Sequence, residues 1–523
     1  MLNRAGTALI FLIMLLPSAV FAWRNQHMAQ FAYLHDDGVL FTSAKSLAAG
    51  DGYRIPSLPE NPSQTKFPPL YPLYLSLIWR FNPQFPDNLP LATLFSWIAL
   101  AVCLGLAWLY YKTSGLSDAR SGLLVCLLGL SPYLILFGCT MFSEVFFTCW
   151  LLLTLLVARR EGLRMAVLAG VLAGAAYLTR TAGIALLVSV PAWMVWKREW
   201  RRAAGFAAGM LPAIIGWTLW TRMHLPHAAD QTLTYYTDYI HYQFLNVGLD
   251  NFAVVLWKNF DQILYGMGSM VLPKVLDILP VKILTQVIGV AMISGVVRMA
   301  RRGIAVDYAL FSLVSVGILL VWHFPPNERF VLPLYPLLLA GLVAEIEHLW
   351  GMLKAGFGHR DFGQRAVAGA LAGVVVIVFG AALALQAYMT FAALPELAEQ
   401  KAAKLRDLRV TYAWIGANLP PSTEILSYDD PLMYLYADRR GNYLPLLPRW
   451  WYGEDHTSIV GAYRNVAAYC RSRGLTYFYF TTEDLQREAG DEDRQEIERS
   501  VRQNPELTPI FSAGIGTLFK VRN

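Results

Sequence analysis

Charged residues are scarce in this chain, and their scarcity excludes most classes of soluble protein. Asp, Glu, Lys and Arg make up 15% of the 523 residues, whereas hydrophobic residues make up 56%. A soluble globular domain carries roughly 25% charged residues. Disorder is excluded as well, because 13% of the residues are aromatic and could bury a large surface. With a mean hydropathy of +0.40, the composition predicts a polytopic membrane protein with some mass outside the bilayer.

Cysteine is rare too, and the common catalytic motifs are missing. Four of the five cysteines lie in apolar runs and Cys470 stands alone, so neither a zinc site nor a disulfide framework is indicated. There is no P-loop, GxGxxG, GxSxG or HExxH pattern, and nothing indicates use of a soluble nucleotide. The net charge of +6 is modest and is explained by basic cytoplasmic loops rather than by nucleic-acid binding.

Long apolar runs are abundant. A spanning helix needs about 20 mostly apolar residues, and the sequence predicts about eleven such spans. Met1–Ala22 also has the basic start, apolar run and small-residue end of a cleaved signal peptide; we favour a retained helix. The predicted spans lie near residues 5–23, 90–111, 119–137, 140–158, 165–179, 181–196, 203–221, 276–297, 304–322, 330–350 and 366–392.

Basic residues are distributed unevenly between the loops that join these runs. If the N-terminus is inside, the inner segments hold about sixteen Lys and Arg residues, whereas the short outer turns hold only Arg180 and Arg329. The positive-inside rule therefore predicts a multi-pass protein of the inner (cytoplasmic) membrane with a cytoplasmic N-terminus. An odd number of spans then places the C-terminal region in the extracytoplasmic (periplasmic) space.

The sequence predicts two domains. Residues 1–392 would form a transmembrane domain with outer loops at about 24–89 and 222–275, and residues 393–523 a small extracytoplasmic α/β domain. This last region has the composition of a soluble protein and mixes helical and strand-like patterns. The helical patterns are Leu397–Leu419 and Asp491–Arg502; the strand-like ones are Glu424–Ser427, Thr476–Phe480 and Thr508–Val521.

Two adjacent carboxylates, Asp36 and Asp37, follow the first apolar run within the run His35-Asp36-Asp37. Two neighbouring carboxylates cannot both be desolvated cheaply without a cation, a proton or a hydrogen-bond network. At the edge of a membrane bundle such a pair is a candidate general base. The alternative is a solvated helix cap that precedes the amphipathic stretch Val39–Ala49, and the residues alone do not decide between the two.

Four further ionisable residues lie at or near the predicted outer surface. Lys66 precedes two prolines and a hydrophobic segment, Leu70–Trp79, that is too short to span comfortably. It could contact a lipid phosphate or simply snorkel to the interface. Glu144, Arg180 and Arg329 lie at the ends of apolar runs, where ionisable residues suggest a functional or paired role. They could also be interface anchors, and Arg329 could pair with Glu328.

The middle loop holds several potential metal ligands among four tyrosines. Their spacing fits no strong metal signature, so a helix that lies on the membrane surface is the favoured interpretation and a zinc site the minor one. The residues concerned are His224, His227, Asp230, Asp238 and His241.

In order along the chain, these motifs resemble those of the GT-C membrane glycosyltransferases that use polyprenyl-phosphate sugars. The similarity is greatest to the bacterial branch related to protein O-mannosyltransferases and lipid A aminoarabinose transferases. Asp36-Asp37 is similar to the family's acidic pair after the first helix, although Glu is common at the second position. Lys66-Phe-Pro-Pro-Leu-Tyr71 is similar to its Lys-Pro-Pro-Leu-Tyr, with Phe67 inserted. Further matching stretches are Ser143-Glu144, Thr179–Gly183, Glu328–Pro333, Tyr412–Pro420 and Asp438–Arg440.

The resemblance implies an inverting glycosyltransferase with a GT-C-like helical fold. A monosaccharide (hexosyl or pentosyl) would pass from a polyprenyl-phosphate donor to an acceptor hydroxyl of a lipid, glycan or protein at the outer membrane face. Asp36 and Asp37 would be catalytic. Lys66, Arg180 and Arg329 would bind the donor phosphate, and Glu144 and Tyr71 would contact substrate. No cofactor is certain, and use of a divalent cation is left open.

Two other classes of function remain as alternatives. An isoprenoid-lipid transporter or flippase would place charged residues in the middle of the bundle, whereas here they gather at one face. A non-catalytic GT-C-like assembly subunit would not need Asp36, Asp37 and Lys66. The identity of the sugar and of the acceptor depends on cavity shape, which this sequence alone does not specify.

Overall fold

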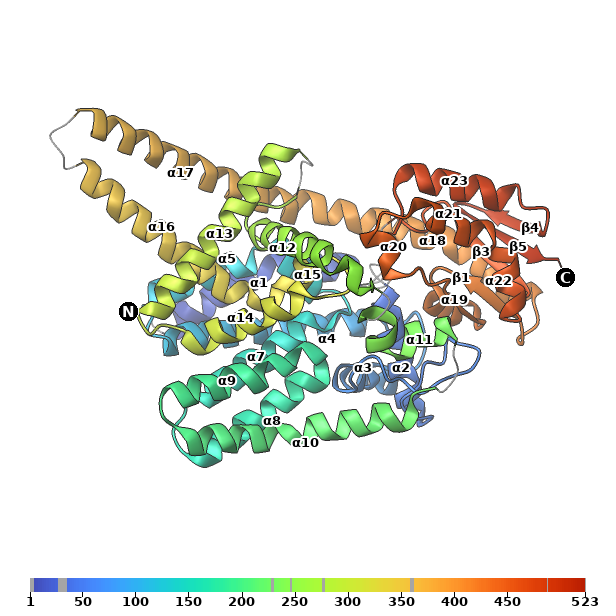
Figure 1. The fold of residues 1–523 in the computed structure, drawn as a ribbon, viewed down its shortest axis with the longest axis horizontal. Coiled ribbons are helices and arrows are strands. Elements are labelled where there is room, and N and C mark those ends of the chain that lie inside the picture. Colours follow the sequence, from blue (N-terminus) through green and yellow to red (C-terminus); the bar gives the residue numbers. More distant parts are fainter. Residues whose placement is uncertain are drawn as a thin grey trace. The chain divides into compact units, whose positions relative to one another are not determined.

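The computed structural model describes residues 4–26, 35–226, 230–244, 247–274, 278–357, 362–486 and 488–522 (Figure 1). The chain forms two compact units, each assembled from separate stretches of sequence. The first comprises Met1–Arg24, Leu94–Ile215 and Leu256–Glu396, and the second Asn25–Thr93, Gly216–Val255 and Leu397–Asn523. The predicted domain boundary at residues 392 and 393 remains a prediction.

The first unit is helical. Its helices approach one another closely where both carry glycine, as is common between membrane helices: a Cβ atom on Gly295 would lie 1.8 Å from the carbonyl oxygen of Gly341. Its elements, some of which continue into the other unit, are α1 (Arg4–Asn25), α4 (Leu89–Thr113), α5 (Asp118–Gly129), α6 (Pro132–Gly138), α7 (Ser143–Ala158), α8 (Leu163–Thr179), α9 (Ala185–Trp196), α10 (Trp200–His224), α12 (Phe252–Ser269), α13 (Leu279–Arg301), α14 (Val306–Leu320), α15 (Glu328–Val331), α16 (Tyr335–Phe357) and α17 (Phe362–Tyr388).

Within the described ranges, five helices are long and apolar enough to cross a membrane: Leu89–Thr113, Trp200–His224, Leu279–Arg301, Glu328–Ala355 and Arg365–Asn418. Helices α5 and α6, which meet at a bend of 66°, would make a sixth if they form one span. Shorter apolar helices cover the remaining predicted spans. The predicted helical fold with many apolar helices is therefore confirmed, while the number of about eleven crossings stays a prediction.

The second unit combines helices from the two predicted outer loops with the C-terminal region. No linker precedes the C-terminal region, because the chain stays helical from Arg365 to Asn418. This helical run includes a π-helical turn at Met389–Ala393. The elements of this unit include α2 (His35–Ala49), α3 (Leu70–Phe81), α11 (Gln231–Thr237), the π-helical turn Tyr239–Phe244, α18 (Leu394–Asn418), α19 (Asp430–Ala437), α20 (Pro448–Tyr452), α21 (His456–Arg464), α22 (Val466–Ser472) and α23 (Asp491–Arg502).

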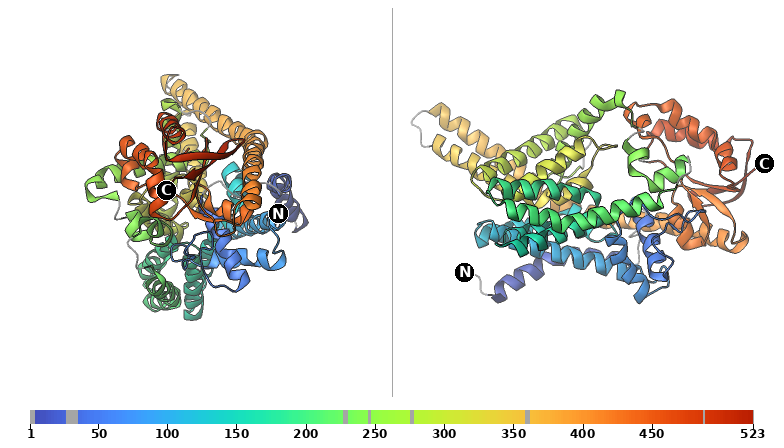
Figure 2. Two further views of the ribbon diagram at one scale, coloured as in Figure 1. Left: turned by 90° about the vertical axis from the view of Figure 1, so that its right-hand side faces the viewer. Right: turned by 60° about the horizontal axis from the view of Figure 1, so that its bottom comes forward.

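A β-sheet lies in the C-terminal region (Figure 2). It has five strands in the order β2-β1-β3-β5-β4. Strand β1 (Glu424–Ser427) pairs in parallel with both β2 (Arg440–Asn442) and β3 (Tyr477–Thr481), whereas β4 (Leu507–Ala513) and β5 (Gly516–Val521) form an antiparallel hairpin beside β3. The predicted small α/β fold is confirmed. Strand β2 was not predicted, because Arg-Gly-Asn has little β-propensity.

Both faces of the sheet are covered by helices. Alternate residues of β3 point to opposite faces: Phe478 and Phe480 pack with α21, α22 and α23 in one apolar cluster. On the other face, Tyr479 contacts Tyr412 of α18 at a ring-centroid distance of 5.8 Å. The C-terminal region therefore has a core of its own.

Candidate functional site

The first turn of α2 carries the candidate carboxylates. The helix begins at His35, so Asp36 and Asp37 lie where unpaired N–H groups and the helix dipole favour negative charge. Asp37 is 1% exposed, and its Oδ1 accepts a hydrogen bond from the backbone N–H of Gly38 at 2.9 Å. Asp36 is partly exposed. The two carboxylates are therefore not both solvated: Asp37 is buried, whereas solvent can reach Asp36.

Lys66 lies in the same unit and is buried. Its Nζ donates a hydrogen bond to the carbonyl oxygen of Tyr235 at 3.0 Å and lies 4.3 Å from the centroid of the Tyr235 ring. Burial lowers the pKa of Lys66 to about 8, against the attraction of Asp36, which raises it. An ammonium that is held in this way differs from a freely snorkelling lysine.

The turn that presents Lys66 is anchored to neighbouring segments. Gln64 Oε1 accepts the backbone N–H of Lys66 at 2.9 Å, and the Gln64 carbonyl accepts the indole N–H of Trp220 at 2.9 Å. Thr65 donates to the Thr237 carbonyl at 2.7 Å. Tyr71 lies in α3, where it is buried and stacks on Tyr74 with ring centroids 6.3 Å apart.

A buried network that the sequence did not reveal joins the start of α2 to the C-terminal region. His35 Nε2 donates to Asp430 Oδ1 at 2.6 Å, and the Tyr236 hydroxyl donates to the same oxygen at 2.5 Å. Asp430 is 0% exposed. His35 and Asp430 are 395 positions apart in the chain, and neither is part of a recognisable motif, so no pattern in the sequence links them.

In the first unit, three predicted site residues come together. Glu144, in the first turn of α7, is fully buried. Its Oε1 accepts hydrogen bonds from both Arg180 Nη1, at the end of α8, and Arg329 Nε, in α15. Arg180 Nη1 also donates to Ser143 Oγ at 3.0 Å. The structure thus brings one carboxylate and two guanidinium groups together from three separate helices.

Among the described residues, cationic side chains outnumber carboxylates around this group. The neighbouring Glu328 forms an ion pair with Lys274 at 2.6 Å and accepts a hydrogen bond from Ser269 at 2.9 Å. Among the described residues, the cations Arg180, Arg329 and Lys274 therefore stand beside the carboxylates Glu144 and Glu328. An excess of fixed positive charge on guanidinium groups is the chemistry of an anion site, phosphate above all.

A second buried carboxylate, also missed from sequence, lies at the other end of α7. Arg159 Nε and Nη2 donate to the two oxygens of Asp307, each at 2.7 Å, and the Tyr110 hydroxyl donates to Oδ1 at 2.8 Å. Arg159 Nη1 donates to Ser114 at 2.7 Å. This fork-to-fork pair is electrically balanced.

The potential metal ligands of the middle loop do not gather. Asp230 pairs with Arg473, Asp238 pairs with His241 at 2.5 Å, and His224 stacks on Trp220. His227 lies outside the described residues. Across the described ranges, no three His, Cys, Asp or Glu side chains are grouped so that they could hold a metal ion.

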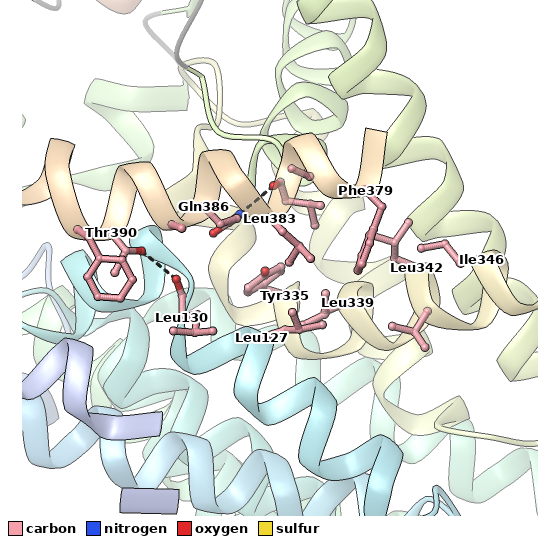
Figure 3. Close-up of a pocket in the computed structure, with 15 residues that line it drawn as sticks. Leu127, Leu130, Tyr335, Leu339, Leu342, Ile346, Phe379, Leu383, Gln386 and Thr390 are labelled. Atoms are coloured by element: carbon pink, nitrogen blue, oxygen red, sulfur yellow. Dashed lines mark hydrogen bonds between the residues drawn. The ribbon is translucent and has the colours of Figure 1, made fainter. Parts of the chain in front are cut away.

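An apolar pocket in the first unit is lined by α5, α16 and α17 (Figure 3). Two of its polar side chains are engaged by backbone carbonyls: Gln386 Nε2 donates to Met270 and Val271 at 2.8 and 2.9 Å, and Thr390 donates to Leu130 at 2.9 Å. The rest of the lining is aliphatic or aromatic. Such a surface suits an aliphatic chain.

Comparison with solved structures gives matches over nearly the whole chain. ArnT from Cupriavidus metallidurans in the apo state is 12% identical, with a TM-score of 0.56 and coverage of 98% of both chains. ArnT bound to undecaprenyl phosphate gives the same identity and TM-score, with coverage of 99% of this chain and 98% of that chain. The Archaeoglobus fulgidus oligosaccharyltransferase tethered with an acceptor peptide is 10% identical, with a TM-score of 0.57 and coverage of 98% of this chain and 74% of that chain.

No family model and no curated protein sequence matches the chain. At 10–12% identity the structural matches establish the fold. That fold is the GT-C fold that the sequence motifs resemble, and the expected resemblance is confirmed at this level.

Proposed function

We propose that this chain, which has the fold of ArnT and of an archaeal oligosaccharyltransferase, is an inverting membrane glycosyltransferase. It would move a hexosyl or pentosyl group from a polyprenyl-phosphate donor to an acceptor hydroxyl at the outer face of the cytoplasmic membrane. The observation that carries the proposal is the pair of arginines on the single buried carboxylate of Glu144. Two guanidinium groups oriented side by side on one carboxylate form a cationic group of the kind that binds a phosphate.

Arg180 and Arg329 are proposed to bind the donor phosphate. When the bond between the sugar C1 and the phosphate oxygen breaks, negative charge accumulates on the leaving polyprenyl phosphate. Guanidinium groups that are already oriented stabilise this charge without reorganisation at the moment of reaction. Binding of undecaprenyl phosphate is recorded for ArnT, and a polyprenyl-phosphate donor for this chain rests on the shared fold and on these arginines.

Glu144 is proposed to act through the arginines. Because it is fully buried and accepts a hydrogen bond from each of them, it is better suited to orienting two guanidinium planes than to contacting a sugar. The contact to substrate that the sequence suggested for Glu144 is therefore replaced by a positioning role. The substrate contact of Tyr71 stays a prediction.

Asp36 is proposed as the general base. It is the more exposed of the two carboxylates, and an acceptor hydroxyl could reach it. As the acceptor oxygen forms its bond to C1, its proton passes to Asp36, while the electrons of the broken bond leave with the phosphate. This single displacement inverts the anomeric centre. Asp37, buried beside it, would position the base, and the Lys66 ammonium would add positive charge toward the donor.

The acceptor is a lipid, a glycan or a protein, and the site would lie at the outer surface of the inner membrane. A neighbouring oligosaccharyltransferase structure holds zinc and sulfate, but the described residues of this chain offer no cluster that would hold a metal ion. No described contact favours a transporter or a non-catalytic subunit.

The test is transfer by the full chain in membranes supplied with a panel of radiolabelled undecaprenyl-phosphate hexoses and pentoses. Asp36→Asn should lower transfer by about 10²–10⁴-fold, because general base catalysis contributes that much. Asp51→Asn, which makes the same charge change at an exposed position after α2, is the matched control and should leave the rate unchanged. If Asp36→Asn transfers as fast as wild type, Asp36 is not the base. If wild type transfers no sugar from any donor, the proposed enzyme class is wrong.

A further inference from the structure

Burial of the Asp430 carboxylate costs free energy, because the charged group loses its hydration. It opens α19 in the C-terminal region and is fully buried. Its Oδ1 receives hydrogen bonds from His35 and Tyr236, whereas among the described residues its buried Oδ2 has no hydrogen-bond partner. A buried carboxylate that is only half satisfied needs a positive charge nearby. His35, one residue before the proposed base, is the group that supplies it.

The environment of His35 favours its charged form. Burial alone lowers its pKa, but the charge of Asp430 and its hydrogen bond, with smaller contributions from Asp36 and Asp429, outweigh burial and raise the pKa above the ordinary value. The tyrosine rings lie 5.4–5.9 Å from the imidazole centroid. The titratable groups around His35 are Asp36, Asp429, Asp430, Tyr235, Tyr236 and Tyr443.

Backbone packing brings α2 and α19 together at the same point. Gly38 follows the two candidate carboxylates, and a Cβ atom there would lie 2.7 Å from Cβ of Pro431. Glycine is unfavourable inside a helix, so its presence in α2 is explained by this close approach. Tyr236, from the middle loop, also lies at this point: its hydroxyl accepts the backbone N–H of Tyr443 at 3.0 Å and donates to Asp430. Three segments that are far apart in the sequence therefore converge on His35.

From this geometry we propose that Asp430 is a positioning residue of the active site, which acts through His35 to fix the first turn of α2 and with it Asp36 and Asp37. The inference rests on the proposed function of Asp36. It makes the C-terminal region part of the catalytic machinery, since α19 supplies a side chain without which the carboxylates of α2 lose their support. A general base must be held within hydrogen-bond reach of its proton, and a displacement of about 1 Å can cost about 10²-fold in rate.

The experiment uses the full chain in membranes with the donor panel described above. Asp430→Asn keeps the shape of the side chain and removes its charge; we expect kcat to fall by about 10- to 100-fold with KM changed less than about twofold. Asp429→Asn is the matched control, because it removes the same charge one residue earlier without a hydrogen bond to His35, and we expect it to retain near wild-type kcat. Asp430→Glu should recover part of the lost rate.

Two measurements separate positioning from a general loss of fold. In a double-mutant cycle, His35→Gln with Asp430→Asn should be no worse than the more damaging single variant, because both break one interaction. The [13Cε1]-histidine resonance that disappears in His35→Gln should titrate above pH 6.5 in wild type and at lower pH in Asp430→Asn. This titration needs no substrate, so it reports on the pair even if no donor is used.

Equal losses in Asp429→Asn and Asp430→Asn, an additive double mutant, or a rate that falls only in proportion to the amount of folded protein would overturn the inference. An unmoved His35 titration would overturn it too. Absence of transfer by wild type would instead count against the proposed function and leave the titration result standing.

Discussion

The two ends of α7 both bury a carboxylate, but they neutralise its charge in different ways. Each end holds a buried carboxylate from one helix against an arginine from another, and the ends are about 22 Å apart at 1.5 Å per residue. Asp307 receives one arginine, Arg159, on both of its oxygens. Glu144 receives two arginines, Arg180 and Arg329, on a single oxygen.

The comparison shows how many cationic side chains are needed to bury one carboxylate in this fold. A buried carboxylate must be paired, because an unpaired charge in a low-dielectric interior is strongly destabilising. One arginine meets that need at Asp307, so the second arginine at Glu144 is not explained by burial of the carboxylate. We therefore expect Arg159 to stabilise the fold and the second arginine at Glu144 to serve the reaction. Substitution of each arginine tests this assignment.

The largest effect is expected at the balanced end. Arg159→Met removes the guanidinium partner of Asp307 and leaves that carboxylate buried, so the free energy of unfolding should fall by about 3–5 kcal/mol. Arg160→Met changes the adjacent, exposed arginine and should stay within about 0.5 kcal/mol of wild type. Thermal unfolding of the two variants in detergent measures the difference, and equal melting temperatures would remove the structural role of the pair.

At the other end the expected effect is on the rate. Arg180→Met leaves Glu144 paired with Arg329, so the free energy of unfolding should fall by clearly less than in Arg159→Met, which leaves a buried carboxylate without its guanidinium partner. Transfer from the donor panel should nevertheless drop by about 10²–10³-fold, equivalent to about 2.7–4 kcal/mol, as when one stabilising donor is removed from a transition state. A loss of stability as large as that of Arg159→Met would show that both arginines serve the fold and would abolish the contrast.

The smallest effect concerns the one proposed phosphate ligand that titrates. The pKa of Lys66 is lowered to about 8 by burial, so its ammonium is charged below that pH and is lost as the pH rises through it. The alkaline fall in kcat/KM should approach tenfold per pH unit, or about 1.4 kcal/mol. Lys66→Arg should remove this step, because guanidinium stays charged. Arg180→Lys is the control, which should lower the rate at every pH, and an alkaline step unchanged in Lys66→Arg would contradict the role of Lys66.

Much of the fold could be predicted because apolar runs and strand alternation are local patterns. The helix Asp491–Arg502 has the predicted bounds, and the predicted stretch Thr508–Val521 forms the β4–β5 hairpin. Strand β2 could not be predicted, because its three residues owe their strand conformation to pairing with β1. The two-unit contact pattern was equally inaccessible, since it depends on packing between distant segments.

The site divides in the same way. Charged residues at the ends of apolar runs were visible, and the structure shows that Arg180 and Arg329 both contact Glu144. The partners of buried groups were not visible. Asp430 looks like an ordinary first-turn residue of a short helix, and only the folded chain shows that it is bonded to His35.

The separation of 395 positions between His35 and Asp430 has a consequence for biosynthesis. The ribosome makes the first turn of α2 early, yet the carboxylate that pairs with His35 follows only after every predicted span has been made. The nascent chain therefore lacks the support of its own first helix turn throughout membrane insertion. On the proposed roles of these residues, the enzyme would stay inactive until its C-terminal region is synthesised and folded, and the order of translation would time its activation.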